Sequence, residues 1–219
     1  MTKPRIVSET KRSVEEREPP GPSTLRAHEW LSSESAAAYD EMMRLGTPFE
    51  VYLSHKAEKK IREHAIKQAK GMLEAMGFLL GEVRAWRGKN YLVIRGVGTT
   101  ELRSSRSNVR FDPQAFPKLF MDLDGSGFDY VIVGWYHSHP GHTCFLSRTD
   151  LKTQRNMFNQ PYHVALVIDP VNKEIKIFRL AGDGYIEVPF AVHKDDQARK
   201  SRNGKARTRT LKVKPVIPT

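Results

Sequence analysis

The sequence has 219 residues, of which 39% are hydrophobic, enough for one domain of ordinary size with tails. Its single cysteine, Cys144, excludes an intrachain disulfide framework, and no signal-like start or long apolar run is evident, so we expect a soluble, cytoplasmic protein. The formal net charge of +11 would suit nucleic-acid binding. Residues 194–219, however, hold nine Lys or Arg against two acidic residues, a difference of +7. Most of the positive charge therefore lies in a basic tail and not in the folded domain. We expect neither a membrane nor a nucleic-acid partner.

The composition divides the chain into four segments. Residues 1–22 mix charged residues with Pro and Ser and are predicted to be disordered. Residues 23–48 are predicted to be an N-terminal helical extension, capped by Ser23 or Thr24, as one broken helix or two short ones. We expect it to pack on the domain surface, and the alternative is a regulatory segment that covers the active site. Residues 49–190 form the folded domain, and residues 191–219 a basic, flexible tail.

The folded domain alternates between strand-like and helix-like patterns, an order that predicts an α/β sandwich in which helices flank a mixed sheet. Ser54 caps a helix that carries alanine or isoleucine every four residues on one face and stops near Gly71. A second helix, at residues 112–122, opens with proline at the first helical position. Predicted strands lie at residues 49–53, 73–83, 91–97, 131–136, 164–168, 174–180 and 185–190.

Four residues that follow the strand at 131–136 suit a metal site. His137 and His139 are two apart in an extended segment, so both imidazoles can point to the same side. Ser147 is a natural helix N-cap, and Asp150, three residues later, is its capping-box partner in the first turn. Two imidazoles and one carboxylate can then reach one ion. Three protein ligands with a fourth position left for water is the pattern of a catalytic zinc site.

Hydrolysis at such a site needs a carboxylate that accepts a proton from the attacking water. Glu74 and Glu82 both border the apolar run at residues 76–80, and a carboxylate beside a buried strand needs a reason to be there. The residues alone favour Glu74 only slightly. A zinc deaminase is excluded, because its Cys-x-x-Cys ligand pair cannot be built from one cysteine.

These residues also carry a family resemblance. His137-Ser138-His139-Pro140, with Ser147 and Asp150, resembles the His-x-His-Pro and Ser-x-x-Asp signature of the JAMM (MPN+) zinc metallo-isopeptidases, and residues 74–81 look like that family's strand with the catalytic glutamate. The resemblance runs from about residue 49 to 190. It is closest to the proteasome-lid deubiquitinases and suggests a stand-alone, archaeal-type form. It implies a cytidine-deaminase-like MPN sandwich, whose mixed sheet is mostly antiparallel.

The resemblance also assigns roles. It implies one Zn²⁺ per chain, held by His137, His139 and Asp150. Glu74 would act as the general base and then as the acid, and Ser147 would hydrogen-bond the developing oxyanion in addition to capping its helix. Cys144 is expected to be buried beside the loop rather than to serve as a fourth ligand.

The family hydrolyses the bond after the C-terminal Gly-Gly of ubiquitin or a ubiquitin-like protein. The resemblance therefore implies a deubiquitinase that deconjugates such proteins or matures their precursors. Its partners would be ubiquitin-like conjugates, with the proteasome and a homodimer as further candidates. The polar loop at residues 99–110 would gate the groove for the substrate tail or be plain solvent-exposed chain. The alternative is an adaptor that binds the proteasome or nucleic acid through its basic tail.

Overall fold

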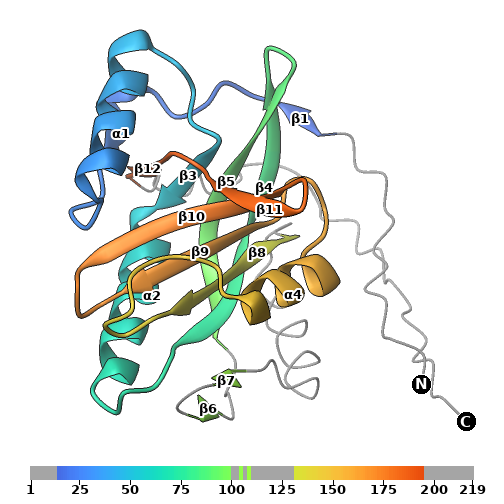
Figure 1. Cartoon of the computed structure of the whole chain (residues 1–219). Coiled ribbons are helices and arrows are strands. Elements are labelled where there is room, and N and C mark those ends of the chain that lie inside the picture. The colour runs from blue at the N-terminus through green and yellow to red at the C-terminus, as the bar shows by residue number, and fades with distance from the viewer. Residues whose placement is uncertain (1–13, 100–103, 106–107, 110–130, 195–219) are drawn as a thin grey trace, which may run out of the picture.

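The computed structural model describes residues 14–99, 104–105, 108–109 and 131–194 (Figure 1). The predicted helix at residues 112–122, the first thirteen residues and the tail after residue 194 lie outside these ranges. Most of the predicted polar loop at residues 99–110 does too. Its described parts are two short strands that pair with each other, β6 (Ser104–Ser105) and β7 (Asn108–Val109).

A ten-stranded sheet organises the described chain, in the order β11-β10-β9-β8-β4-β5-β3-β12-β2, with β1 paired to β4. Five of its strand pairs are antiparallel and four are parallel, so the predicted mixed, mostly antiparallel sheet flanked by helices is confirmed. The strands are β1 (Glu15–Glu16), β2 (Leu25–Arg26), β3 (Val51–Ser54), β4 (Met76–Trp86), β5 (Lys89–Thr99), β8 (Val131–Ser138), β9 (Val164–Asp169), β10 (Glu174–Ala181), β11 (Gly184–Glu187) and β12 (Phe190–His193).

The central strands approach one another closely at glycines. Gly134 on β8 has a φ of 154°, and a Cβ there would collide with the carbonyl oxygen of Val164 on the neighbouring strand. Gly81 stands at a register shift of the β4–β5 pair, where a Cβ would meet the carbonyl of Val93. These irregularities lie in the two long strands that lead to the candidate site.

Helices cover both faces of the sheet (Figure 1). Helix α2 (His55–Ala69) begins at the predicted cap Ser54, whose hydroxyl accepts the Ala57 N–H, and its buried face contacts the largest core cluster. Helices α1 (Ser33–Leu45) and α4 (Arg148–Met157) pack on side chains that alternate to the other face. Helix α1 thus packs on the folded domain.

The N-terminal segment differs from its prediction. Residues 14–22 are not disordered: β1 pairs with the end of β4, and the Arg17 N–H donates to the Ala85 carbonyl. Neither Ser23 nor Thr24 caps α1, because Leu25 and Arg26 form a strand beside β12. The cap is Ser32, whose hydroxyl accepts the Ser35 N–H, and Gly46 ends the helix in the left-handed conformation.

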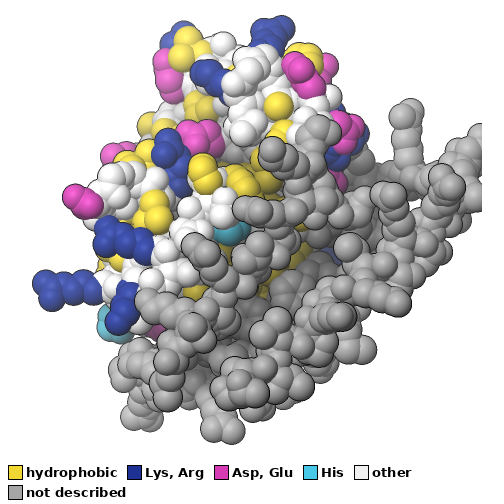
Figure 2. All heavy atoms as spheres, turned by 90° about the vertical axis from the view of Figure 1, so that its right-hand side faces the viewer, with side chains coloured by type: hydrophobic (Ala, Val, Ile, Leu, Met, Phe, Trp, Pro, Cys, Tyr) yellow, Lys and Arg dark blue, Asp and Glu magenta, His cyan; other side chains and the backbone are white. Residues whose placement is uncertain are grey.

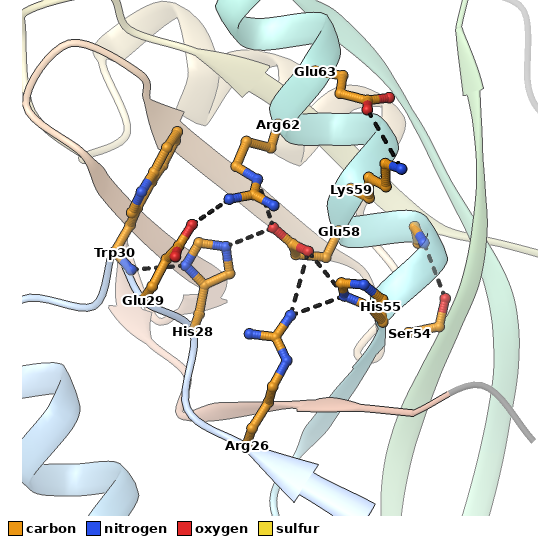
Figure 3. A network of polar contacts seen from close by, with 11 residues as sticks. Arg26, His28, Glu29, Trp30, Ser54, His55, Glu58, Lys59, Arg62 and Glu63 are labelled. Carbon is orange, nitrogen blue, oxygen red and sulfur yellow. Dashed lines mark hydrogen bonds and ion pairs between the residues drawn. The ribbon is translucent and has the colours of Figure 1, made fainter.

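A buried carboxylate fixes the segment between β2 and α1 (Figure 3). Glu58 of α2 is 2% exposed, and its oxygens lie 3.0 Å from His28 Nε2, 3.1 Å from Arg62 Nε, 3.3 Å from His55 Nδ1 and 3.5 Å from Arg26 Nη2. The Trp30 N–H donates to His28 Nδ1, so Nε2 carries the ring proton and donates it to Glu58. This network anchors the chain that precedes α1 on α2.

The C-terminal end of the fold also differs from its prediction. The single strand expected at residues 185–190 is two strands at distant places in the sheet. β11 extends the β10 edge, whereas β12 runs parallel to β3 on the far side. The folded part therefore includes residues 191–193, which the prediction places in the tail.

The described part of the chain has a mixed charge distribution on the face seen in Figure 2 and no helix suited to a membrane. On the face shown in Figure 2, Lys and Arg side chains are interspersed with Asp and Glu instead of gathering into one basic patch. Among the described residues, no helix is long and apolar enough to cross a membrane.

Candidate metal centre

Strand β8 carries the two histidines to one end of the sheet. His137 is 1% exposed and His139 6% exposed, and their Nε2 atoms lie 3.1 Å apart. The His137 ring stacks on Trp135, with ring centroids 4.3 Å apart and an angle of 11° between the planes. His139 Nδ1 lies 3.2 Å from the carbonyl oxygen of Thr143. Since a carbonyl only accepts, Nδ1 carries the proton and Nε2 keeps its lone pair.

Helix α4 supplies the third group. Its capping box is present as predicted: the Ser147 hydroxyl accepts the Asp150 N–H at 3.2 Å, and Asp150 Oδ2 accepts the Ser147 N–H at 2.7 Å. This cap sets Asp150 in the first turn, facing β8. Asp150 Oδ1 is 3.5 Å from His137 Nε2, and Oδ2 is 3.6 Å from His139 Nε2. The three side chains form the group of potential metal ligands found among the described residues.

The geometry of this group fits zinc. With Zn–N and Zn–O distances of about 2.0–2.1 Å, two ligand atoms of a tetrahedral site lie about 3.3 Å apart. The two Nε2 atoms are 3.1 Å apart, and the carboxylate approaches them at similar distances, with Oδ1 3.5 Å from His137 and Oδ2 3.6 Å from His139. Two imidazoles and a carboxylate that converge at such distances could hold a metal ion. The donor set, two nitrogens and one oxygen, is also one that zinc accepts in catalytic sites.

The electrostatics of the three groups favour the charged carboxylate. Burial would raise the pKa of Asp150, but hydrogen bonds with His137 and His139, the charge of His137 and a hydrogen bond with Ser147 outweigh it and lower the pKa far below its ordinary value. Burial would lower the pKa of His139, but the neighbouring Asp150 raises it overall. The surroundings of Asp150 thus favour its charged form, which is the form that can bind a cation.

Glu74 lies beside this group because of strand register. Met76 pairs with His137, and the Ser138 N–H donates to the Ala75 carbonyl. Glu74 directly precedes this pairing, and its carboxyl interacts electrostatically with His137, His139 and Asp150. Glu74 is half-buried, and burial raises its pKa while the charges of His137 and His139 oppose that rise. A raised pKa suits a carboxyl that must accept and then return a proton.

Glu82, the second candidate base, faces a different environment. It lies on β4 opposite Val93, well along the strand from Met76. Its Oε2 accepts bonds from the Arg84 guanidinium at 2.7 and 2.9 Å, and Oε1 lies 3.8 Å from Arg95 Nε. Glu82 thus serves an ion-pair cluster away from the metal group.

Cys144 is buried beside the loop, as predicted. It is 7% exposed, its Sγ lies 3.3 Å from the Val167 carbonyl oxygen, and burial raises the pKa of its thiol strongly. A thiol held protonated in this way is a poor metal ligand. His142 is exposed in the same loop.

The sequence did not reveal two buried residues that support the ligands. Gln154 of α4 accepts the Trp135 indole N–H at 2.6 Å, and its amide donates to the carbonyls of Phe158 and His163. Asp169, at the end of β9, accepts N–H groups from the loop that follows His139. The sequence signal for each was weak: Gln154 is a polar residue on the buried face of its helix, and Asp169 is a polar residue at the end of an apolar strand.

Comparisons with known proteins identify the family of the chain. The family model for the JAB1/Mov34/MPN/PAD-1 ubiquitin proteases matches residues 47–161, more than half of the chain. The chain therefore belongs to this family, and the predicted JAMM/MPN+ membership is confirmed.

Curated relatives lie in two large assemblies. COP9 signalosome complex subunit 5 of Debaryomyces hansenii is 34% identical over 145 residues, which cover 61% of this chain and 29% of the relative. The 26S proteasome non-ATPase regulatory subunit 14 of Dictyostelium discoideum is 34% identical over 125 residues, 55% of this chain and 39% of the relative. The 26S proteasome regulatory subunit RPN11 of Eremothecium gossypii is 35% identical over 140 residues, which cover 62% of this chain and 42% of the relative. The chain thus spans well under half the length of these relatives.

A solved structure supports the fold. The solution structure of a protein from Desulfitobacterium hafniense matches with a TM-score of 0.54 at 22% identity, covering 68% of this chain and 97% of that one. The likeness concerns the arrangement of strands and helices alone.

Proposed function

We propose that this protein is a zinc-dependent isopeptidase or peptidase that hydrolyses the bond after the C-terminal Gly-Gly of ubiquitin or a ubiquitin-like protein. The observation that carries the proposal is that the half-buried carboxyl of Glu74, just before β4, interacts electrostatically with His137, His139 and Asp150, a group that could hold a metal ion. Family membership and the names of the relatives support the ubiquitin-directed reaction.

Each residue of the site has a distinct task in this proposal. His137, His139 and Asp150 would hold one Zn²⁺ per chain. Zinc bound by three protein ligands lowers the pKa of a water in its fourth position to about 7 and polarises a carbonyl. Glu74 accepts a proton from the attacking water and delivers it to the departing amine nitrogen, and its raised pKa suits both transfers.

Ser147 can serve two roles with one hydroxyl. Its oxygen accepts the Asp150 N–H as the helix cap, and this bond uses a lone pair. The hydroxyl hydrogen remains a donor that can be directed at a neighbouring oxygen. Because the cap fixes the serine one turn of α4 before the carboxylate ligand side chain, the hydroxyl is held beside the metal group, where oxyanion charge would develop.

The direct experiment is cleavage of ubiquitin and ubiquitin-like fusions by the full chain, with zinc present, with a chelator, and with zinc restored after chelation. We expect cleavage after Gly-Gly that the chelator abolishes and zinc restores. Cleavage that survives complete metal removal would contradict the proposal. Binding of the same proteins without cleavage under all three conditions would favour an adaptor instead. The conjugated substrates, a proteasome partner and action in the cytoplasm belong to the same proposal.

A further inference from the structure

We propose that Asp169 is the positioning residue that shapes the loop after His139 and thereby fixes which ring nitrogen of His139 faces the metal. The inference rests on the proposed metal site, since it concerns how one of its ligands is oriented. Asp169 ends β9, contributes no ligand atom, and is fully buried with 0% exposure. A buried carboxylate at a strand end needs several donors to stay charged.

The carboxylate of Asp169 accepts five hydrogen bonds from two loops. From the loop after His139, the Gly141 N–H donates to Oδ1 at 2.9 Å and the Thr143 N–H donates to Oδ2 at 2.8 Å. From the turn after β9, the N–H groups of Val171 and Asn172 donate to Oδ1, and the Asn172 side-chain amide donates to Oδ2 at 2.7 Å. Burial would raise the pKa of Asp169, but these bonds lower it overall. The loop after His139 is therefore wrapped around a fixed negative charge.

This wrapping imposes an unusual backbone on the loop. Gly141 has a φ of 81° and Thr143 a φ of 64°, both in the left-handed region. For threonine, a β-branched residue, that region is disfavoured, so surrounding contacts must hold it there. Two contacts act on the residue itself: its N–H donates to Asp169, and its carbonyl lies beside His139 Nδ1.

The carbonyl of Thr143 connects this loop conformation to the metal group, because it contacts the His139 ring. With its N–H directed at Asp169, the Thr143 carbonyl lies 3.2 Å from His139 Nδ1 and can accept its proton. The His139 N–H meanwhile donates to the Ile168 carbonyl, next to Asp169, so backbone and ring are fixed from the same strand end. The Nε2 lone pair is then the one that faces His137 and Asp150. Partners of this kind behind a histidine ligand commonly change metal affinity by about 10–100-fold.

The test compares Asp169→Asn with the matched control Asn172→Ala in the full chain. The asparagine side chain has one acceptor oxygen, and its NH₂ group would face N–H donors. Because Oδ1 accepts the Gly141 N–H and Oδ2 accepts the Thr143 N–H, either orientation of the amide loses one bond to the loop after His139. Asn172→Ala removes one bond to the same carboxylate but leaves those of Gly141 and Thr143 in place. Both variants should lower stability. Only Asp169→Asn should lower zinc affinity, by about 10–100-fold in a chelator competition.

A second readout does not need zinc. In the metal-free protein, ¹⁵N NMR at a pH where the His139 ring is neutral should show the Nδ1-protonated tautomer for the parent and Asn172→Ala, and a tautomer mixture for Asp169→Asn. Unchanged tautomer and unchanged zinc affinity in Asp169→Asn would overturn the inference. A parent that shows this tautomer but binds no zinc would instead contradict the proposed function.

A third measurement covers the case in which Asp169→Asn does not fold. Gly141 and Thr143 are exposed residues of a loop, and their amides would exchange quickly without an internal acceptor. In the parent, hydrogen exchange should show both amides protected, because Asp169 accepts them. Exchange of both at the rate of open loop amides would refute the inference without any variant.

Discussion

The indole N–H of Trp135 donates a 2.6 Å hydrogen bond to Oε1 of Gln154, and both side chains are fully buried. Trp135 lies two residues before His137 on β8, and Gln154 lies one helical turn after Asp150 on α4. The bond therefore joins the strand that carries the imidazoles to the helix that carries the carboxylate. Stacking of the same indole on His137 adds a second constraint on that ring.

Trp135→Phe should therefore weaken both the fold and the metal group. The variant leaves Gln154 Oε1 buried without this donor, which costs about 1–3 kcal/mol of unfolding free energy. Denaturant unfolding measures that loss, and a chelator competition measures the accompanying fall in zinc affinity. Trp86→Phe, at the half-buried end of β4, is the matched control and should change zinc affinity little. Equal zinc affinity in the two variants would show that this bond does not position the ligands.

Ser147→Ala separates the two roles of the serine. Loss of the N-cap bond should lower stability by about 1 kcal/mol. If the hydroxyl also stabilises the oxyanion, turnover of a ubiquitin fusion should fall by about 10²–10³ with zinc still bound. Ser32→Ala removes the corresponding cap from α1, away from the site, and should cost stability without loss of turnover. Turnover at the parent level in Ser147→Ala would leave capping as its only role.

Acid should destabilise the anchor of the N-terminal segment. Burial would raise the pKa of Glu58, but its hydrogen bond to His28 and the charges of Arg62 and Arg26 lower it overall. A carboxyl with a depressed folded-state pKa contributes stability above its unfolded value of about 4.3, and that stability is lost as the pH falls below it. Unfolding midpoints of Glu58→Gln between pH 7 and pH 3 should fall less steeply than those of the parent. Glu41→Gln, which breaks only an exposed pair with Arg44, should retain the parent slope.

Gly77 is required by the packing between β4 and β8. A Cβ at this position would lie 2.5 Å from the Tyr136 ring and 2.6 Å from the Gly98 carbonyl oxygen. Gly77→Ala should lower the unfolding free energy by about 1–3 kcal/mol through overpacking. Gly96→Ala on β5, where a Cβ would meet nothing within 4 Å, is the control and should cost less. Since Gly77 lies three residues after Glu74, zinc-loaded Gly77→Ala should also lose turnover.

The sequence predicted the elements that have local signals. Ser54 and Ser147 cap their helices as predicted, and the two histidines and Asp150 meet because a two-residue spacing and a capping box fix their directions. The β4–β5 hairpin also follows its pattern, although its strands extend to Trp86 and begin again at Lys89.

Features that depend on distant partners were not predictable. β12 leaves the neighbourhood of β11 to pair with β3, and no local pattern specifies that crossing. The N-terminal cap was misplaced because Leu25 and Arg26 are drawn into the sheet by β12, and His28 is held by Glu58, thirty residues later. The roles of Gln154 and Asp169 likewise depend on partners that are distant in sequence. Gln154 binds the Trp135 indole, and Asp169 binds the loop after His139.

Glu74→Gln tests the central claim most directly. The amide keeps the shape of the side chain but cannot accept the proton of the water, so the zinc-supplied variant should hold one zinc per chain, retain the parent's stability and cleave no ubiquitin fusion. Glu82→Gln, on the same strand but paired with Arg84, should cleave at the parent rate. Parent-level cleavage by zinc-loaded Glu74→Gln would contradict the account and move the general base to another residue.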